Sequence, residues 1–358
     1  MDYDIKIFTN LDLEIKEYWQ KLEKNCHCYC FQSYDWFQNW FNCYRKNNKD
    51  FNLNVVAVLN KNEIFCILPL EIKNYGRLKI LQWASNKLTD YNSPILSKNF
   101  KYNEKIFKDL WKKIVKASPK FDLIYLQRQP KNIEKCANPF VDFLKNYKQS
   151  KYYYISLPES WKKYSENVLK KKFLNDNLRS KRLLKKIGKI KYRVEKDPKE
   201  KIKYIDDIIK QKNTRLISQG TNIIFNERDI NFYKGFENMN LNNIKTHTSA
   251  LIMNNEIISM NWGILHKKRY YYLLPSMKNG NFEKYSPGKL LISILIKWSI
   301  SKKFKIFDFA LGEETYKKRW SNESEYLYAH LQLKSIKGIF YYFINIIKLS
   351  IKKLVRFK

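Results

Sequence analysis

Apolar and polar positions alternate along the first half of the chain with two different periods. Segments with apolar residues at every third or fourth position predict helices, and segments with a period of two predict strands. Helices are expected at residues 12–24, 34–46, 103–116 and 134–147, and strands at 53–59, 63–72, 78–83, 121–127 and 152–157. The first half is therefore predicted to combine a meander of strands with flanking helices.

The second half repeats this order of elements. Strands are expected at 192–195, 245–253, 256–265, 269–275, 304–309 and 326–334, and helices at 199–219, 227–238 and 287–302. Residues 57–64 and 250–257 share Ala, Asn, Glu and Ile in register, and each segment reads as a hairpin. Both hairpins lead through another strand to a helix and then to a buried strand. We therefore expect a mixed α/β protein built from tandem domains of one fold.

The charge pattern sets the expected domain boundaries. Residues 162–193 contain 13 Lys and Arg against two acidic residues, a local net charge of +11. This pattern predicts a basic helical linker at 159–193 between domains at 1–158 and 194–335. The linker would contact the phosphates of an acceptor, bind RNA, or present a solvated helix face.

The last segment, residues 336–358, combines Ile and Phe with Lys and Arg. It is too interrupted by charge to span a bilayer, and its composition is typical of a basic amphipathic helix. Such a tail would lie on the inner face of an anionic membrane or pack on its own domain.

The composition excludes several classes of protein. Among 358 residues, 44% are hydrophobic and 16% are aromatic, which favours a globular protein over a disordered one. No run approaches the ~18 consecutive apolar residues of a membrane span, and the first residues lack a signal-peptide pattern. A cytoplasmic protein is expected, with peripheral membrane contact left open.

The net charge of +35 indicates an anionic partner. The chain has 58 Lys but only 11 Arg, alongside abundant Asn, Ile, Tyr and Phe, as an AT-rich genome would encode. Arg is the residue suited to bidentate phosphate recognition, so nucleic acid is only one of the candidates, with anionic membrane another.

Three of the six cysteines, Cys26, Cys28 and Cys30, alternate along one segment with His27. Zinc sites usually add a second, distant ligand pair, and the sequence has none. We therefore expect no metal, and we interpret these cysteines as small reduced hydrophobes on one face of an extended segment.

One segment with candidate chemistry opens the helix expected at 287–302. Ser286 is placed to cap the helix and Pro287 suits its first position. Gly288 leaves room for an anion near the first-turn N–H groups, and Lys284 and Lys289 add positive charge. The segment is an anion site or an ordinary helix cap.

A second such segment leaves the buried strand at 304–309. Asp308 lies inside this hydrophobic strand, and Gly312, Glu313, Tyr316 and Lys317 follow it. A buried acid is unfavourable unless it is paired or used, and Lys317 is a natural partner for Asp308 or Glu313. The segment is an active site or a structural ion pair beside a turn.

These segments resemble a known family. The order Tyr285-Ser-Pro-Gly288-Lys, apolar helix, Phe-Asp308-Phe, Gly312-Glu313, Tyr316-Lys317, Trp320 resembles the CelD-like and FemAB-like branch of the GNAT acyltransferase superfamily. Landmarks of the first half are similar to that family as well, namely Phe31-Gln-Ser33 before Trp36 and Trp40, Leu-Pro69-Leu, and Asp90-Tyr-Asn-Ser-Pro94. The resemblance covers about residues 30–335.

The resemblance implies two GNAT-like domains, each a mostly antiparallel sheet with a splayed centre flanked by helices. It implies transfer of an acyl group from acyl-CoA, such as acetyl-CoA, to the amine of an amino sugar or a similar precursor in cell-envelope or exopolysaccharide biosynthesis. The alternative is Fem-type aminoacyl transfer from aminoacyl-tRNA to a peptidoglycan or lipid-linked precursor. A non-catalytic RNA- or membrane-binding protein is the third interpretation.

The resemblance also suggests roles for single residues. The donor would bind at Lys284, Tyr285, Ser286, Gly288 and Lys289 in the C-terminal domain. Catalysis would use Asp308 or Glu313 as base, Tyr316 as proton donor and Lys317 beside the developing oxyanion. The acceptor would bind at Trp36, Asp90 and Trp320.

Overall fold

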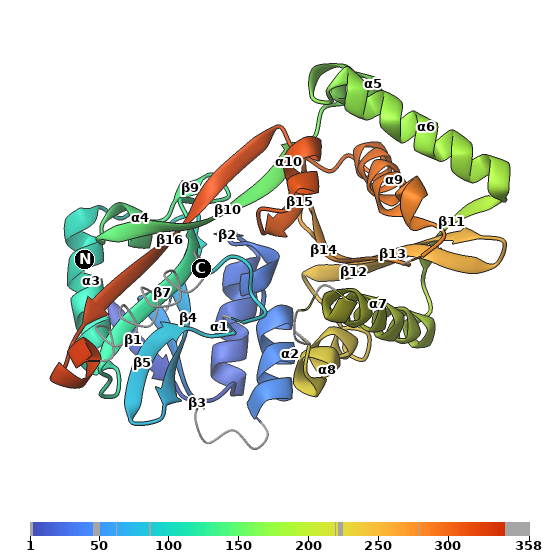
Figure 1. Cartoon of the computed structure of the whole chain (residues 1–358). Helices are drawn as coiled ribbons and strands as arrows, with labels where there is room; N and C mark the ends of the chain where they lie inside the picture. Colours follow the sequence, from blue (N-terminus) through green and yellow to red (C-terminus); the bar gives the residue numbers. More distant parts are fainter. Residues whose placement is uncertain are drawn as a thin grey trace. The chain divides into compact units, whose positions relative to one another are not determined.

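The computed structural model describes residues 3–45, 51–61, 63–85, 87–218, 220, 225–278 and 280–340 (Figure 1). The chain divides into two compact units. Unit 1 contains residues 1–38, 44–150 and 326–358, and unit 2 contains residues 39–43 and 151–325. Residues 159–193 thus belong to unit 2, and residues 326–335 belong to unit 1.

Unit 1 is built on a mostly antiparallel sheet with the strand order β1-β3-β4-β5-β7-β16. Its strands are β1 (Asp4–Phe8), β2 (Cys26–His27), β3 (Phe51–Asn60), β4 (Glu63–Tyr75), β5 (Leu78–Trp83), β6 (Ile95–Ser97), β7 (Leu123–Pro130), β8 (Asn132–Ile133), β9 (Cys136–Ala137) and most of β16 (Glu323–Leu333). Its helices are α1 (Leu13–Glu23), η1 (Cys30–Gln32), the start of α2 (Tyr34–Arg45), α3 (Glu104–Ala117) and α4 (Pro139–Asp142). Within this sheet β5 and β7 run parallel.

Unit 2 repeats the plan with the strand order β10-β15-β14-β13-β12-β11. The strands are β10 (Asn146–Ser156, from residue 151), β11 (Ile190–Glu195), β12 (Ile244–Met253), β13 (Glu256–His266), β14 (Arg269–Met277) and β15 (Ile306–Leu311). The helices are α5 (Trp161–Asn167), α6 (Lys171–Ile187), α7 (Pro198–Ser218), α8 (Glu227–Gly235), η2 (Glu283–Tyr285), α9 (Pro287–Ser301) and α10 (Thr315–Trp320). Helix α9 lies on one face of this sheet and α7 on the other (Figure 1).

The two units confirm the expected α/β fold of tandem, similar domains. In each, a three-stranded antiparallel meander leads through a helix to a strand that pairs in parallel with the last strand of the meander. The matched hairpins are β3–β4 and β12–β13, and Asn254 and Asn255 at the second turn both have positive φ, 49° and 67°. Asn adopts this left-handed conformation more readily than most residues, which explains its place in the turn.

The prediction of a helix at residues 134–147 is wrong. Only α4 forms there, because Pro139 sits at its first turn and the Asn146 side chain then donates to the carbonyl oxygens of Phe140, Val141 and Leu144. These bonds satisfy the carbonyls that a longer helix would have used. Strand β1 was not expected from the sequence; its pattern Asp-Ile-Lys-Ile-Phe alternates, but it is only five residues long and only Phe8 is buried within it.

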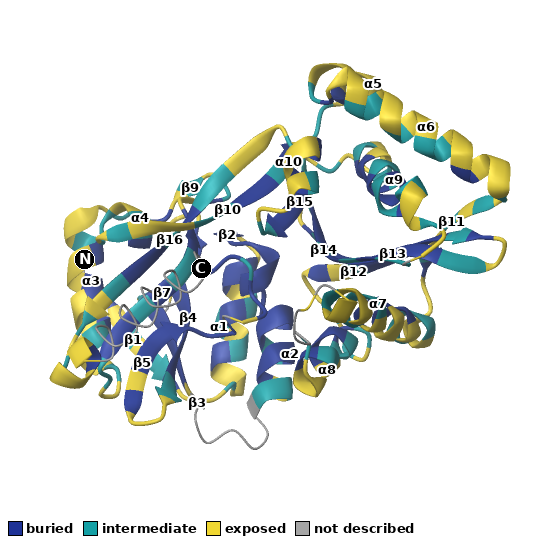
Figure 2. Ribbon diagram, in the orientation of Figure 1, coloured by how far each residue is buried: buried dark blue, intermediate teal, exposed yellow. Residues whose placement is uncertain are grey.

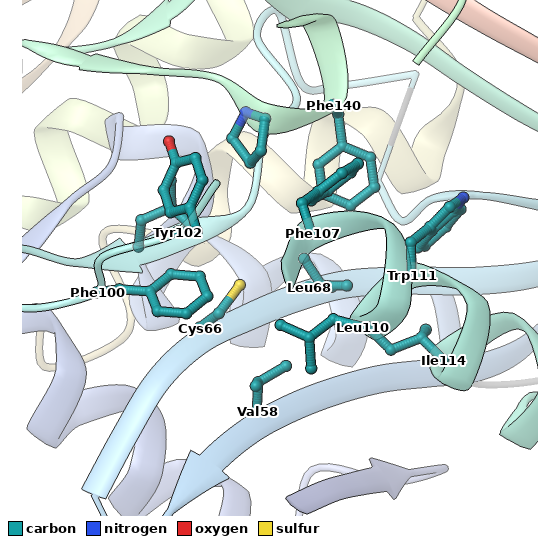
Figure 3. A pocket seen from close by; sticks show the side chains of 12 residues that line it. Val58, Cys66, Leu68, Phe100, Tyr102, Phe107, Leu110, Trp111, Ile114 and Phe140 are labelled. Carbon is teal, nitrogen blue, oxygen red and sulfur yellow. The ribbon is translucent and has the colours of Figure 1, made fainter. Parts of the chain in front are cut away.

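One part of the core of unit 1 lies between its sheet and α3, and another part contains the buried Trp19 of α1 and Trp36 of α2. The buried residues of α3, Phe107, Leu110, Trp111 and Ile114, are three or four positions apart and share one face of the helix. Most residues of β3 and β4 are buried as well (Figure 2). A cavity of about 20 Å³ remains between α3 and the sheet, room for about one water molecule. It is lined by apolar and aromatic side chains, including Val58, Cys66, Leu68, Phe107, Leu110 and Phe140 (Figure 3).

Unit 2 contains a buried ion pair between the neighbouring strands β14 and β15. The Arg269 Nε donates to Asp308 Oδ2 at 2.8 Å, and the Asp308 side chain is fully buried. The Ala310 N–H donates to the other carboxylate oxygen at 2.8 Å, and Ala310 takes a left-handed φ of 57°. The first residue of β14 is thereby tied to the middle of β15, and the chain bends just beyond that point.

We predict that Asp308→Asn lowers the free energy of unfolding by about 3–5 kcal/mol, because it leaves the Arg269 charge without its buried counter-ion. Urea unfolding, monitored by circular dichroism, measures this free energy for the unchanged protein and the variant. Glu313→Gln is the control, since Glu313 is exposed and its change is expected to cost less than about 0.5 kcal/mol. Equal losses for the two variants would contradict the prediction.

Candidate functional site

Strands β14 and β15 separate partway along their length. They pair in parallel only from Arg269 with Ile306 to Tyr271 with Asp308, although β14 continues to Met277 and β15 to Leu311. We call the region beyond this point the splay. In the splay, the backbone edges of the two strands are no longer hydrogen-bonded to each other. An edge that is released in this way can pair with a ligand instead.

Residues 284–289, which we call the donor loop, lead from the splay side of β14 into α9. Ser286 occupies the N-cap position, but its φ of 50° and ψ of 56° are left-handed and its side chain makes no cap bond. The expected side-chain cap by Ser286 is therefore wrong, whereas Pro287 does begin the helix. The first-turn N–H groups are thus not capped by a side chain, which suits an anion.

Gly288 keeps the donor loop open toward the sheet. A Cβ built at Gly288 would lie 3.8 Å from Met277 Sδ and 4.0 Å from Ser259 Oγ, an ordinary contact distance. A methyl group fits at this position, and a large side chain would fill the space beside β13 and β14. Lys284 is exposed and lies over the half-buried Tyr285 ring, and Lys289 lies 6.0 Å from the centre of the Phe173 ring.

The chain turns sharply between β15 and α10. Gly312 has a φ of 127°, which side-chain-bearing residues rarely adopt, and a Cβ there would lie 2.2 Å from Glu314 Oε2. Lys317 Nζ donates to Leu311 O at 2.5 Å and pairs with Glu314 Oε2 at 3.0 Å. The expected pairing of Lys317 with Asp308 or Glu313 is wrong, because Glu314 lies one helical turn before Lys317. The exposed Glu313 accepts instead from the Lys151 N–H at 3.2 Å.

Tyr316 lies half-buried at the start of α10. Its ring packs edge-on against Phe309 of β15, with 6.1 Å between ring centres. Burial, with a contribution from Glu314, raises the pKa of Tyr316 well above its usual value, and Arg215 acts in the opposite direction. The hydroxyl therefore stays protonated at neutral pH and can donate a proton or a hydrogen bond.

Lys212 is a residue of this site that the sequence did not single out. It lies on α7, and its Nζ is 3.4 Å from the carbonyl oxygen of Pro275 on β14. Burial is the main reason why the pKa of Lys212 is lowered to about 8; Glu314 opposes this shift, and Lys317 and Arg215 add to it. The available signal was its position, three and four residues after the buried Ile209 and Ile208, on the apolar stripe of the helix.

Asp308 is held in a structural role. One of its carboxylate oxygens accepts from Arg269 and the other from the Ala310 N–H, and the side chain has no exposed surface. A general base must reach the proton that it removes, and this carboxylate is already directed at Arg269. The structure therefore realises the ion-pair alternative for Asp308, with a partner that is 39 residues away in the sequence.

The residues expected to bind an acceptor lie in different surroundings. Trp36 is 1% exposed in the core of unit 1, and Trp320 is 0% exposed in the core of unit 2, where it packs against Phe173. Both rings pack against protein and offer no surface to a ligand. Asp90 is half-buried in unit 1, and its contact with an acceptor stays a prediction.

Asp90 belongs to a segment, residues 89–93, that fills the equivalent of the splay in unit 1. Strands β5 and β7 pair only at Ile80 with Leu123 and Leu81 with Ile124. Farther along β7, Asn92 donates its backbone N–H to Arg128 O at 2.9 Å and its side chain to Gln127 O at 3.1 Å. The protein's own chain therefore occupies this gap, and the open splay is in unit 2.

Helix α6 gives the donor loop a basic neighbour. It contacts both η2 and α9, and only Leu184 of its 17 residues is buried (Figure 2). Its cationic residues are Lys171, Lys172, Arg179, Lys181, Arg182, Lys185 and Lys186. A polyanion bound at the donor loop would extend naturally along this helix.

The cysteine segment packs into the core of unit 1. Cys26, Cys28 and Cys30 are all buried, and the Cys26 and Cys28 sulfur atoms are 3.4 Å apart. In the part of the chain that the structure describes, no group of three or more His, Cys, Asp and Glu could hold a metal ion.

Over the same residues, no helix is both long enough and apolar enough to cross a membrane. Most of the expected amphipathic tail, residues 341–358, lies outside the described residues.

Comparison with known proteins gives a family match within unit 2. Residues 171–318 match the family model described as an acetyltransferase (GNAT) domain, a range that includes the donor loop, the splay and most of α10. No curated protein matches the chain.

Several solved structures share the fold. The crystal structure of FemX is 12% identical with a TM-score of 0.58, covering 93% of this chain and 98% of that chain. A conserved protein of unknown function from Bacteroides thetaiotaomicron is 11% identical with a TM-score of 0.55, covering 92% and 100%. The C-terminal domain of a protein from Agrobacterium fabrum that bears the name lysylphosphatidylglycerol synthetase is 9% identical with a TM-score of 0.52, covering 91% and 93%. Residues 171–318 are therefore similar to a GNAT acetyltransferase domain, and the chain shares the fold of these solved structures.

Proposed function

We propose that this protein is an N-acyltransferase that takes its acyl donor, an acyl-CoA, at the splay of unit 2. The observation that carries the proposal is the release of β14 from β15 directly beside the uncapped start of α9. The acceptor we propose is the amine of an amino sugar or a similar precursor of the cell envelope. The GNAT domain matched at residues 171–318 supports transfer to an amine in general.

The reaction needs few groups. The amine nitrogen attacks the thioester carbonyl carbon, a C–N bond forms, and the C–S bond breaks with the electron pair leaving on sulfur. Glu313, exposed at the end of β15, accepts the amine proton, and Tyr316 gives a proton to the departing thiolate. The cations of Lys212 and Lys317 face the developing oxyanion from α7 and α10.

A second candidate donor is aminoacyl-tRNA, in a Fem-type transfer to a peptidoglycan or lipid-linked precursor. The observation that favours it is the contact of the basic helix α6 with η2 and α9, which extends positive charge away from the donor loop. The same chemistry would apply, with a ribose oxygen as the leaving group in place of sulfur. A protein that only binds RNA or a membrane would use this surface without catalysis.

Donor binding is tested at Gly288. We predict that acetyl-CoA binds with micromolar affinity and that Gly288→Trp abolishes the binding, because the indole fills the space beside Met277 and Ser259. Gly288→Ala is the matched control and keeps the affinity within about threefold, since its methyl group makes only ordinary contacts. Isothermal titration calorimetry measures the dissociation constant of acetyl-CoA for the unchanged protein and for the two variants.

The same titration separates the two donors. Binding of aminoacyl-tRNA but of no thioester, lost when α6 lysines are changed to Gln, would replace the acyl-CoA proposal by the Fem-type one. If the protein binds neither a thioester nor aminoacyl-tRNA, both transfer proposals are wrong and the non-catalytic interpretation remains.

Proton donation is tested at Tyr316. We predict that Tyr316→Phe lowers kcat by about 10- to 100-fold and leaves the acetyl-CoA dissociation constant unchanged, because the ring still packs on Phe309. Release of the free thiol from acetyl-CoA in the presence of glucosamine measures the rate. Tyr147→Phe in unit 1 is the control and keeps full activity. A Tyr316→Phe protein with unchanged kcat would exclude this role.

The charge of Lys212 gives a pH prediction. Its pKa is about 8, so the stabilising cation is present below that pH and is lost as the pH rises through it. The rate should therefore fall above pH ~8, whereas Lys212→Arg, whose pKa exceeds ~12, should lose this decline. Because the acceptor amine titrates identically for both proteins, the ratio of their kcat/KM values across pH isolates Lys212. A constant ratio would refute the assignment.

A further inference from the structure

Unit 1 contains a basic cavity that the transfer reaction does not use. It has a volume of about 490 Å³ and lies where the starts of β5 and β7 meet the end of α3 and the end of β16. Six cationic residues line it, Arg77, Lys79, Lys116, Lys120, Lys334 and Lys337. Its one acidic lining residue is Asp122, so positive charge dominates the cavity.

Asp122 does not neutralise these cations, because its carboxylate holds the cavity walls together. Oδ2 accepts from the Lys79 backbone N–H at 2.8 Å, and Oδ1 accepts from the Ser335 hydroxyl at 2.6 Å. The Asp122 carbonyl oxygen also accepts from the Lys334 N–H at 2.9 Å. Among the described residues, none of the six cationic side chains forms an ion pair. Their charge is therefore available to an anionic ligand.

Exposed apolar side chains lie close in the chain to the cavity residues Lys334, Ser335 and Lys337. Ile336 is 73% exposed, Ile339 is 42% exposed and Phe340 is 66% exposed, and they follow the lining residues Lys334 and Ser335 in the chain. Gly338 fixes this segment against the cavity wall, because a Cβ there would lie 2.6 Å from the Asp122 carbonyl oxygen. Large apolar side chains held in water beside concentrated positive charge are typical of a surface that meets an anionic bilayer.

We infer that the basic cavity binds the phosphate headgroup of an anionic phospholipid while Ile336 and Phe340 enter the acyl region of the same leaflet. A phosphate satisfies the unpaired cations, and the bilayer interior receives the exposed apolar side chains. Nucleic acid would use the cations, and its bases could stack on Phe340, but it would leave the aliphatic side chains of Ile336 and Ile339 in water. An anionic lipid surface takes up all of these groups.

The chain continues beyond Phe340 with a sequence that suits the same surface. Residues 341–358 carry Lys348, Lys352, Lys353 and Arg356 among Ile, Leu, Val and Phe. The cavity residues belong to unit 1, whereas the splay and the donor loop belong to unit 2. Membrane binding and acyl transfer are therefore separable, and the inference does not depend on the proposed function.

Flotation of the full-length protein with vesicles tests the inference. Vesicles of phosphatidylcholine with phosphatidylglycerol should bind the protein, and vesicles of phosphatidylcholine alone should not. A cavity variant, Lys116→Gln with Lys120→Gln and Lys334→Gln, should bind about tenfold or more weakly. A matched control, Lys101→Gln with Lys105→Gln and Lys131→Gln, removes the same charge from exposed positions outside the cavity and should bind as the unchanged protein does.

A second variant tests the apolar part, since Ile336→Ser with Phe340→Ser should also weaken vesicle binding by about tenfold. Because all of these side chains are exposed, each variant should keep the circular dichroism melting curve of the unchanged protein.

Three results would overturn the inference. Equal loss in the cavity and control variants would assign binding to the overall charge of the chain. Full vesicle binding by the Ser variant would exclude apolar insertion. Binding of a single-stranded RNA that depends on the cavity lysines, without binding of vesicles, would assign the cavity to nucleic acid.

Discussion

The buried ion pair between Asp308 and Arg269 is the interaction on which the geometry of unit 2 depends. A carboxylate without exposed surface needs a counter-charge and hydrogen bonds, and Arg269 and the Ala310 N–H supply them. This pairing joins Arg269, at the first registered pair of β14 and β15, to Asp308, at the last one, and β15 bends just beyond Asp308. The open edges, the turn at Gly312 and the start of α10 all follow from that bend.

Much of the fold could be predicted from the sequence, because most strands and helices have strong apolar periods. The repeat of meander, helix and parallel strand was visible in both halves and is present in both units. The errors lie where polar side chains override the pattern. Asn146 ends α4 through three bonds to backbone carbonyls, and no apolar period records such bonds.

The candidate site was predictable in part and for a different reason. Asp308 and Gly312 stand out because an acid in an apolar strand and a glycine after it are unusual. Their partners could not be found in the same way. Arg269 meets Asp308 only through a parallel strand pairing, and Lys212 meets β14 only when α7 packs on the sheet. Which carboxylates are structural depends on such tertiary contacts.

The occupied gap in unit 1 has a consequence for the molecule as a duplicated fold. The segment that contains Tyr91 and Asn92 is covalently tethered beside β7, so it competes for the gap at an effective concentration that a free ligand seldom matches. Unit 1 in effect carries a permanent, intramolecular ligand of its own. The two units therefore differ in one respect: a ligand that sought this gap in unit 1 would first have to displace the chain's own segment.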